Sequence, residues 1–259
     1  MSKIIQISDI HIGGEYDGQF DCWGNLETVL KAASTHVPKD IFGFTYPLVI
    51  VSGDVCDGDA ATTDNYKAVD DMVKKYLGKN VIYTVGNHDN AKVMGETLGF
   101  DPDDVVAYVA NQYDSPYILF HIPTYSGTVD PSAITERIMR WISAQDDDIK
   151  KLPRYAYSHF PIGHVDHRFM QNGHALEHGD DLAERLGVLG IKDVFCGHYH
   201  MGITTHPSST SPWVNVCPAT QCQLDPYSKD CKPTGDYPGY AVIDMYSDYA
   251  DVKYRYVAR

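Results

Sequence analysis

The sequence predicts an α/β protein in which two packed β-sheets carry helices on their outer faces. Apolar runs at 3–8, 47–52 and 80–85 each end in a loop that bears Asp or Asn, as expected for buried parallel strands. Helical patterns at 26–34 and 64–77 lie between them, so strand, loop and helix repeat. The C-terminal third changes character and consists of strand-like segments, with apolar and polar residues alternating most clearly in the last one.

The remaining predicted elements complete the two sheets. They are strands at 116–122, 153–158, 192–196, 202–206, 213–217, 239–246 and 249–257, helices at 132–145 and 181–189, and an acidic stretch at 101–114. Residues 217–238 are rich in Pro, Asp, Ser and Gly and too long for a tight hairpin, so we expect a surface excursion that acts as a lid or interface loop. With no internal repeat, we expect a single domain over 1–259.

Composition excludes several classes of protein. Hydrophobic residues at 43% supply a substantial core, which argues against disorder. The net charge of −14, from 29 Asp and 6 Glu against 21 Lys and Arg, lacks the footprint of a protein that binds nucleic acid stably. The N-terminus resembles no signal peptide and no apolar run is long enough to span a membrane, so we expect a soluble protein in the cytoplasm.

The cysteines fit a reducing compartment. They contain no Cys-x-x-Cys pair and are Cys22, Cys56, Cys196, Cys217, Cys222 and Cys231. The last three are close enough in sequence for a local disulfide, which stays open as the less favoured alternative.

Side chains able to bind metals follow five of the predicted strands. They are Asp9 with His11, Asp54, Asn87 with His88, His159, and His198 with His200. Taken singly these motifs carry little weight, because a chain so rich in Asp and His contains about one Asp-x-His pair by chance. Their common position does carry weight, since the carboxyl ends of parallel strands share one edge of a sheet. The sequence therefore predicts that these loops converge on one site.

The residue types indicate two metal ions. A carboxylate such as Asp54 has two oxygens and can bridge cations about 3.5–4 Å apart. Imidazoles favour Fe, Zn, Mn or Co over Ca, so the expected cofactors are two divalent or mixed-valence ions from that group. Solvent between two cations loses its proton near neutral pH and becomes a nucleophile. His88 is left to protonate the leaving oxygen.

The ordered motifs resemble those of the calcineurin-like metallophosphoesterase superfamily. They are Asp9-Ile10-His11, Gly53-Asp54, Gly86-Asn87-His88-Asp89, His159 and Gly197-His198-Tyr199-His200. In form and spacing they are most similar to the class III cyclic nucleotide phosphodiesterase and glycerophosphodiesterase branch. That branch often has paired His and paired Pro at the fifth motif, whereas this chain has Ser158-His159-Phe160-Pro161.

The resemblance implies a four-layer αββα sandwich. Proteins of this kind are frequently dimers, so a homodimer is the oligomer we expect. It implies that Asp9, His11 and His200 bind the first metal, that Asn87, His159 and His198 bind the second, and that Asp54 bridges them. Asn87 and His88 are expected to contact substrate, and so is His164, the nearest of four histidines that follow His159. The alternative for those four, which include His167, His174 and His178, is that they are polar loop residues.

These observations predict a metal-dependent phosphodiesterase that hydrolyses a small organic phosphodiester by attack of a metal-bridging hydroxide. A 3′,5′-cyclic nucleotide is the best single candidate. A glycerophosphodiesterase or a broad-specificity phosphomonoesterase is the alternative within the enzymes, and the acidic composition argues against a nuclease. The non-enzyme alternative is a scaffold module that has the same fold but binds no metal. The chain retains every ligand position and His88, which argues against this alternative.

Overall fold

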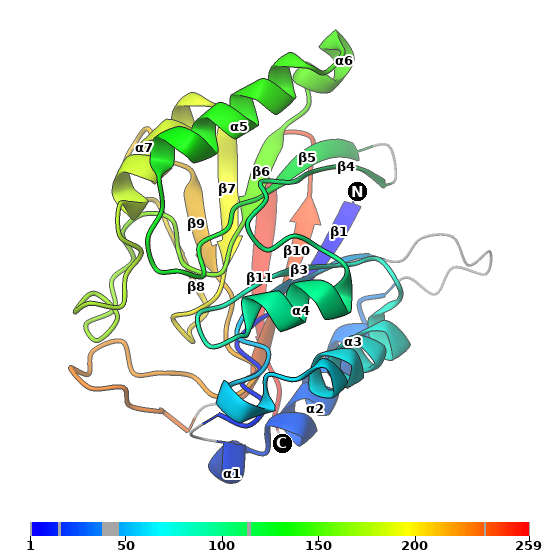
Figure 1. Ribbon diagram of the computed structural model, residues 1–259, viewed down its shortest axis with the longest axis vertical. Helices are drawn as coiled ribbons and strands as arrows, with labels where there is room; N and C mark the ends of the chain where they lie inside the picture. Colours follow the sequence, from blue (N-terminus) through cyan, green and yellow to red (C-terminus); the bar gives the residue numbers. More distant parts are fainter. Residues whose placement is uncertain (1, 15–16, 38–46, 113–114, 236, 259) are drawn as a thin grey trace.

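Two mixed β-sheets pack face to face between two layers of helices, as the sequence predicts (Figure 1). The computed structural model describes residues 2–14, 17–37, 47–112, 115–235 and 237–258. The first sheet has the order β11 (Ala250–Tyr256), β10 (Gly239–Met245), β1 (Ser2–Ile7), β2 (Leu48–Ser52) and β3 (Val81–Thr84). Strands β1, β2 and β3 are parallel, and β10 is antiparallel to both of its neighbours.

The second sheet also has a parallel centre. Its order is β4 (Ala107–Gln112), β5 (Ser115–His121), β6 (Arg154–Tyr157), β7 (Ile191–Cys196), β9 (Trp213–Val216) and β8 (Ile203–Thr205). Strands β5, β6, β7 and β9 run parallel, and β4 and β8 pair antiparallel at the two edges. Each sheet therefore gathers several strand carboxyl ends at one edge.

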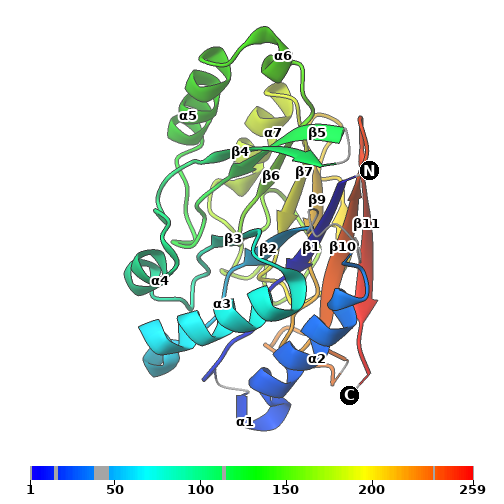
Figure 2. The ribbon, with the colours of Figure 1, turned by 90° about the vertical axis from the view of Figure 1, so that its right-hand side faces the viewer.

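Helices cover the outer face of each sheet. Helices α2 (Cys22–Ser34) and α3 (Thr63–Leu77) pack on the first sheet, and α4 (Ala91–Leu98) packs on α3. Helices α5 (Pro131–Ser143) and α7 (Gly179–Val188) pack on the second sheet, so the two helical layers lie on opposite sides of the strands (Figures 1 and 2). The short elements are α1 (Asp17–Phe20), η1 (Gly58–Ala60) and α6 (Asp147–Lys150).

Alternation along the strands explains why both faces of each sheet are buried. In β1, Ile5 and Ile7 face the helices α2 and α3, whereas Ile4 faces the other sheet. In β5, Phe120 faces the helices α5 and α7, whereas Leu119 faces the first sheet. Because successive side chains of a strand point to opposite faces, runs that are apolar throughout can fill a helix layer and an inter-sheet layer at once.

Polar links join the two sheets close to the strand carboxyl ends. The Gln6 side chain of β1 donates hydrogen bonds to Ser52 Oγ of β2 and to the Cys196 carbonyl of β7, both at 2.9 Å. His121 Nε2 of β5 lies 3.0 Å from Thr84 Oγ1 of β3. These buried contacts fix the edge of one sheet relative to the edge of the other.

The predicted strands and longer helices agree with the structure except in the regions described next, and the short elements α1, η1 and α6 were not predicted. Residues 101–114 form more than an acidic surface stretch, because β4 lies within them and pairs with β5. Helix α4, which follows the Asn87 loop, was not predicted. It has only 8 residues, too few for helical periodicity to stand out, and its sequence signal is the N-cap Asn90, which accepts a hydrogen bond from Val93 N.

Residues 217–238 are only in part the surface excursion that their composition predicts. Residues 217–224 are buried, and their backbone bonds to the loops that follow β1 and β7. Thr220 N donates to Ser8 O at 2.9 Å, Gln221 N to Asp9 O at 3.0 Å, and Leu224 N to His200 O at 3.0 Å. Only the part from residue 225 onward is predominantly exposed.

Among the described residues, no helix is both long and apolar enough to cross a membrane. The single domain, the homodimer and the cytoplasmic location stay predictions of the sequence.

Truncation of the inter-sheet layer should destabilise the protein strongly. Leu119 is fully buried between the sheets, so Leu119→Ala removes apolar contacts and leaves a cavity. We expect a loss of about 2–5 kcal/mol in the free energy of unfolding, measured by urea denaturation. Val188→Ala, at a side chain that is 85% exposed, is the control and should change it by less than about 0.5 kcal/mol. Equal losses in both variants would contradict the assigned core.

Candidate metal centre

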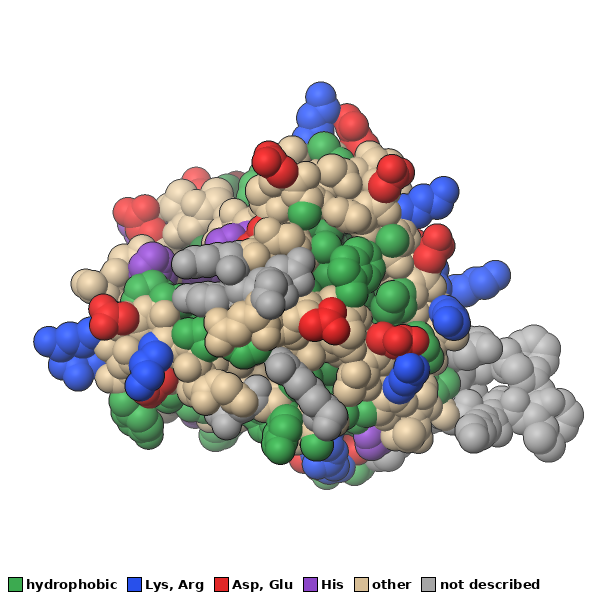
Figure 3. All heavy atoms as spheres, turned by 90° about the horizontal axis from the view of Figure 1, so that it is seen from below, with side chains coloured by type: hydrophobic (Ala, Val, Ile, Leu, Met, Phe, Trp, Pro, Cys, Tyr) green, Lys and Arg blue, Asp and Glu red, His purple; other side chains and the backbone are tan. Residues whose placement is uncertain are grey.

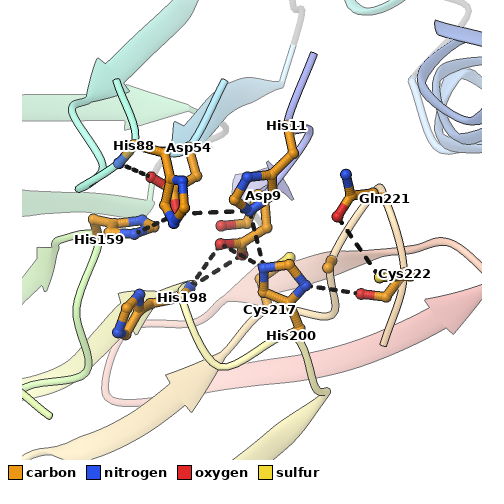
Figure 4. Close-up of polar contacts among 12 residues, drawn as sticks. Asp9, His11, Asp54, His88, His159, His198, His200, Cys217, Gln221 and Cys222 are labelled. Carbon is orange, nitrogen blue, oxygen red and sulfur yellow. Dashed lines mark hydrogen bonds and ion pairs between the residues drawn. The ribbon is translucent and has the colours of Figure 1, made fainter. Parts of the chain in front are cut away.

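Loops from both sheets converge where the parallel strands end (Figure 4). The loops after β1 and β2 are joined by backbone hydrogen bonds from Ile10 N and His11 N to Asp54 O, each 2.9 Å long. The loop after β7 is joined to the loop after β1, because His198 N donates to both carboxylate oxygens of Asp9 at 3.0 and 3.1 Å. Hydrogen bonds that involve the backbone therefore hold these loops together at one site.

The converging loops form three groups of three donors each: two consist of predicted ligands, and the third combines His11 with Asp57 and His88. Asp9, His11 and His200 offer ligand atoms that lie within 4.8 Å of one another, and so do Asp54, His159 and His198. All six side chains are buried. These are the six titratable residues among the seven predicted ligands, and the assignment of each to one ion or to both stays a prediction.

Asp54 lies between the two groups. Its Oδ2 is 3.6 Å from His11 Nε2 in the first group and 3.2 Å from His159 Nε2 in the second. The seventh predicted ligand, Asn87, lies beside the second group, with its Oδ1 3.1 Å from His159 Nε2. The geometry thus places a carboxylate where it can contact two ions and an amide oxygen next to one of them.

Hydrogen bonds on the far side of each imidazole set the orientation of the rings. The Nδ1 atoms of His11, His159 and His200 contact Asp57 Oδ1, Ser52 O and Cys222 O at 2.8, 2.8 and 2.9 Å, and His198 Nε2 contacts His174 O at 2.8 Å. Three histidines therefore present Nε2 to the centre, whereas His198 has Nδ1 free. Such outer contacts fix the tautomer and direction of a metal-binding imidazole.

The backbone of this site is held in an uncommon conformation. Seven described residues other than glycine have positive φ, and five of them are Asp9, His11, Asp54, His198 and His200, with φ between 50° and 69°. Non-glycine residues rarely adopt this left-handed region, and where they do the surrounding structure must compensate for the strain.

Two glycines allow the closest approaches of the backbone to the carboxylates. A Cβ atom at Gly86 would overlap the Asp54 carboxylate, and one at Gly197 would overlap Ser8 Oγ and come within 2.7 Å of Asp9 Oδ2. Glycine is therefore required at both positions, because any other side chain would clash with these neighbours.

The electrostatics of the site favour added positive charge. Burial lowers the pKa of His11, but its hydrogen bond to Asp57 and the charges of Asp54 and Asp57 raise this pKa to about 9. Burial also lowers the pKa of His159, but the charge and hydrogen bond of Asp54 raise it to about 9. Burial raises the pKa of Asp54, yet His159 and His11 hold it well below its usual range. No described lysine or arginine pairs with Asp9 or Asp54.

The donor set fits divalent ions. Burial lowers the pKa of His200 to about 4 and, with the charge of His159, that of His198 to well below its usual value, so both imidazoles are neutral and able to act as ligands. Buried carboxylates need a cationic partner, because an isolated charge is costly away from water. Two cations among these seven side chains would meet that need.

Asp57 lies in the candidate site but is not among the residues predicted from the sequence. Its carboxylate contacts His11 Nδ1 at 2.8 Å and His88 Nδ1 at 3.3 Å. Burial raises the pKa of Asp57, but these two histidines lower it to about 2; its hydrogen bond in turn raises the pKa of His88. Asp57 follows Asp54 by three residues, which is the signal that could have identified it, although 29 aspartates make any single spacing uninformative.

Asp89 holds the site loops and does not cap a helix. Its carboxylate accepts hydrogen bonds from Val55 N, Cys56 N and Gly86 N at 2.9–3.0 Å, and from the Tyr66 hydroxyl at 3.1 Å. Burial and the charge of Asp54 raise its pKa to about 6. Asp89 therefore positions the neighbouring loops of the site.

The candidate centre opens into a cavity of about 290 Å³. Its lining residues are His11, Asp54, Asp57, Asn87, His88, Phe169, Met170, His174, His198, His200, Gln221, Leu224 and Cys231. On the face seen from below, histidine side chains reach the surface toward one side, whereas lysines and arginines project mainly from the periphery (Figure 3). A larger, open hollow of about 690 Å³ beside α4 and Tyr125 contains none of the predicted ligands.

His164 lies outside this cavity, so its predicted contact with substrate has no support in the geometry. Its Nε2 lies 3.0 Å from Asp166 Oδ1, and it lines a separate hollow together with His178. Among the described residues that line the cavity, those following His159 in the chain begin at Phe169, although His164 is nearer to His159 in sequence. His174 is the one of the four histidines that lines the cavity.

Comparisons of sequence and fold agree with this geometry. The family model of calcineurin-like phosphoesterases matches residues 2–202. No curated protein matches the sequence significantly. Several solved structures share the fold.

Three of these structures illustrate the likeness. A dimetal phosphatase from Danio rerio has a TM-score of 0.58 and 14% identity, covering 98% of this chain and 96% of its own. A purple acid phosphatase from yellow lupin (Lupinus luteus) has a TM-score of 0.59 and 12% identity, covering 98% of this chain and 51% of its own. Phosphopantetheinyl hydrolase from Mycobacterium tuberculosis has a TM-score of 0.50 and 17% identity, covering 85% and 90%.

Identities this low show the fold alone, and this chain spans about half the length of the lupin enzyme. The family model, in contrast, matches most of the chain and extends across all five motifs. The chain belongs to the calcineurin-like phosphoesterase family.

Proposed function

We propose that this protein is a metal-dependent phosphodiesterase for a small organic phosphodiester, with a 3′,5′-cyclic nucleotide as the leading candidate. Family membership supports the coarser activity, metal-dependent hydrolysis of phosphoesters. In our assignment Asp9, His11 and His200 hold one ion, Asn87, His159 and His198 hold the other, and Asp54 contacts both. Two such ions, when bound, activate solvent as a nucleophile and neutralise charge on the phosphate oxygens.

The character of the cavity wall carries the preference for a diester. Among the described residues that line the cavity there is no lysine and no arginine. A phosphodiester bears a single negative charge, whereas a monoester bears about two at neutral pH and is commonly bound with additional cationic side chains. A cavity whose positive charge comes from the metal site and His88, without lysine or arginine, therefore fits the diester better.

The size of the cavity favours a small substrate. About 290 Å³ is at the lower end of the range for sites that bind small molecules, roughly 300–1,000 Å³. The net charge of −14 opposes approach by a nucleic acid. Both observations support a small ester over an oligonucleotide.

His88 is placed to transfer a proton. Its Nδ1 faces Asp57 Oδ2 at 3.3 Å, so Nε2 is the nitrogen left for a ligand in the cavity, and the side chain is 50% exposed. The backbone N of His88 donates to Asp54 Oδ1 at 2.9 Å, which fixes the residue relative to the proposed bridging ligand. In this role Nε2–H donates its proton to the leaving oxygen as the P–O bond breaks.

A substrate panel tests the proposal. Purified protein loaded with Mn or Fe should hydrolyse bis-p-nitrophenyl phosphate, and among natural esters cAMP or cGMP should give the highest kcat/KM. The panel should include glycerophosphodiesters, phosphomonoesters and oligonucleotides as comparisons. No turnover of any diester by protein with two bound ions would overturn the proposal, and faster turnover of monoesters would make the protein a phosphatase.

Removal of the proposed bridging ligand should abolish both metal retention and activity. Asp54→Ala eliminates the one carboxylate that lies between the two donor groups. We expect fewer than two ions per chain after dialysis and a fall in kcat/KM of at least about 10³-fold. Metal content measured by mass spectrometry, with circular dichroism to verify folding, provides the readout. Two ions retained in a folded Asp54→Ala variant would contradict the assignment.

Loss of His88 should leave the metals in place and slow the chemistry. His88→Ala is expected to lower kcat by about 10²–10⁴-fold for alkyl esters, whose leaving groups need a proton, and far less for p-nitrophenyl esters. Asp57→Asn should reduce kcat in the same pattern, because the amide holds His88 less well. The comparison rests on kcat for the two ester classes and on metal content. An equal decrease for both classes would show that His88 is no proton donor.

A further inference from the structure

The residues that line the cavity at the metal centre fall into two chemical groups. One group consists of five of the seven predicted ligands together with Asp57 and His88. The other contains Phe169, Met170, Leu224 and His174, with Gln221 and Cys231. The wall formed by Phe169, Met170, His174 and Leu224, which we call the ring wall, contains no Asp, Glu, Lys or Arg side chain.

The ring wall presents a pair of parallel rings. The rings of Phe169 and His174 are stacked, with centroids 4.4 Å apart and an interplanar angle of 26°. Phe169 is only partly buried, whereas Met170 and Leu224 are almost fully buried. An aromatic ring that already has one stacked neighbour and still lines a cavity offers a flat, apolar surface to a ligand.

Backbone contacts hold the ring wall at a fixed position relative to the metal centre. The carbonyl of His174 contacts Nε2 of His198, a proposed metal ligand, at 2.8 Å. Arg168 N donates to Pro226 O at 2.8 Å, which ties the Phe169 segment to the loop that carries Leu224. Leu224 N in turn donates to His200 O at 3.0 Å. Both halves of the wall are therefore anchored to residues of the centre itself.

We infer that the ring wall is a binding subsite for a flat, uncharged ring in the organic group of the ester. This inference rests on the proposed function and narrows it to esters of ring-bearing alcohols, such as nucleosides or aryl alcohols. An aromatic surface attracts planar π-systems by stacking and accepts different bases, because each has a π-face. The lack of a cationic side chain on the wall disfavours a carboxylate group there.

Two phosphonates that differ only in a ring test this subsite without turnover. The monomethyl esters of methylphosphonic and phenylphosphonic acid, called methylphosphonate and phenylphosphonate below, carry the same single negative charge for the metal centre, and the second adds a ring for the ring wall. Titration calorimetry on the protein loaded with Mn should give a dissociation constant at least about tenfold lower for phenylphosphonate. Phe169→Ala should reduce this ratio to below about threefold, and Phe169→Leu, which keeps apolar bulk but no ring, should give an intermediate ratio.

Tyr227→Ala is the matched control, because this aromatic side chain lies on the same loop as Leu224 but is 83% exposed and does not line the cavity. It should leave the ratio unchanged. If methylphosphonate binds and phenylphosphonate binds no more tightly to the unaltered protein, the subsite is wrong while the proposed function stands. If neither binds to protein with two bound ions, the proposed function and the subsite both fail.

Discussion

The burial of two carboxylates away from any lysine or arginine is the constraint on which this structure depends. Asp9 and Asp54 are at most 1% exposed, and their only described ionic partners are histidines. Anions removed from water are stable only when paired and hydrogen bonded. The backbone amides of His198 and His88 meet part of this need, and the elevated pKa values of His11 and His159 show how strongly the site favours further positive charge.

The rest of the fold can be understood as the support of this charge cluster. The two sheets are joined by Gln6 directly beneath it, and five ligand residues adopt left-handed backbone that only a rigid surrounding maintains. The strain is tolerable because each loop begins at the end of a buried strand and is cross-bonded to another loop. Stability of the layers and geometry of the centre are therefore coupled through the same few contacts at the sheet edge.

Much of this arrangement could be predicted from the sequence, for an identifiable reason. Strand runs and ligand motifs are local, so the loop after 3–8 and the loop after 80–85 could be placed at one edge from the rule for parallel strands. The contacts of Asp57 could not be predicted, because they depend on the path of an irregular loop. With 29 aspartates in the chain, the spacing of Asp57 from Asp54 did not single it out. The position of His164 could not be predicted either. Its distance from His159 in sequence does not determine where an irregular segment places it in space.

The proposed ligands and the ring wall lie on different parts of the fold. The proposed ligands lie within a few residues of strand ends, where the hydrogen-bonded sheets fix them, whereas the ring wall comes from two long irregular segments that meet through the Arg168–Pro226 contact. Substitution in those segments can alter the shape and polarity of the wall without moving a strand. In our proposal the reaction type is therefore tied to the sheets, and the choice of ester to Phe169, His174 and Leu224, which lie outside the strands and helices.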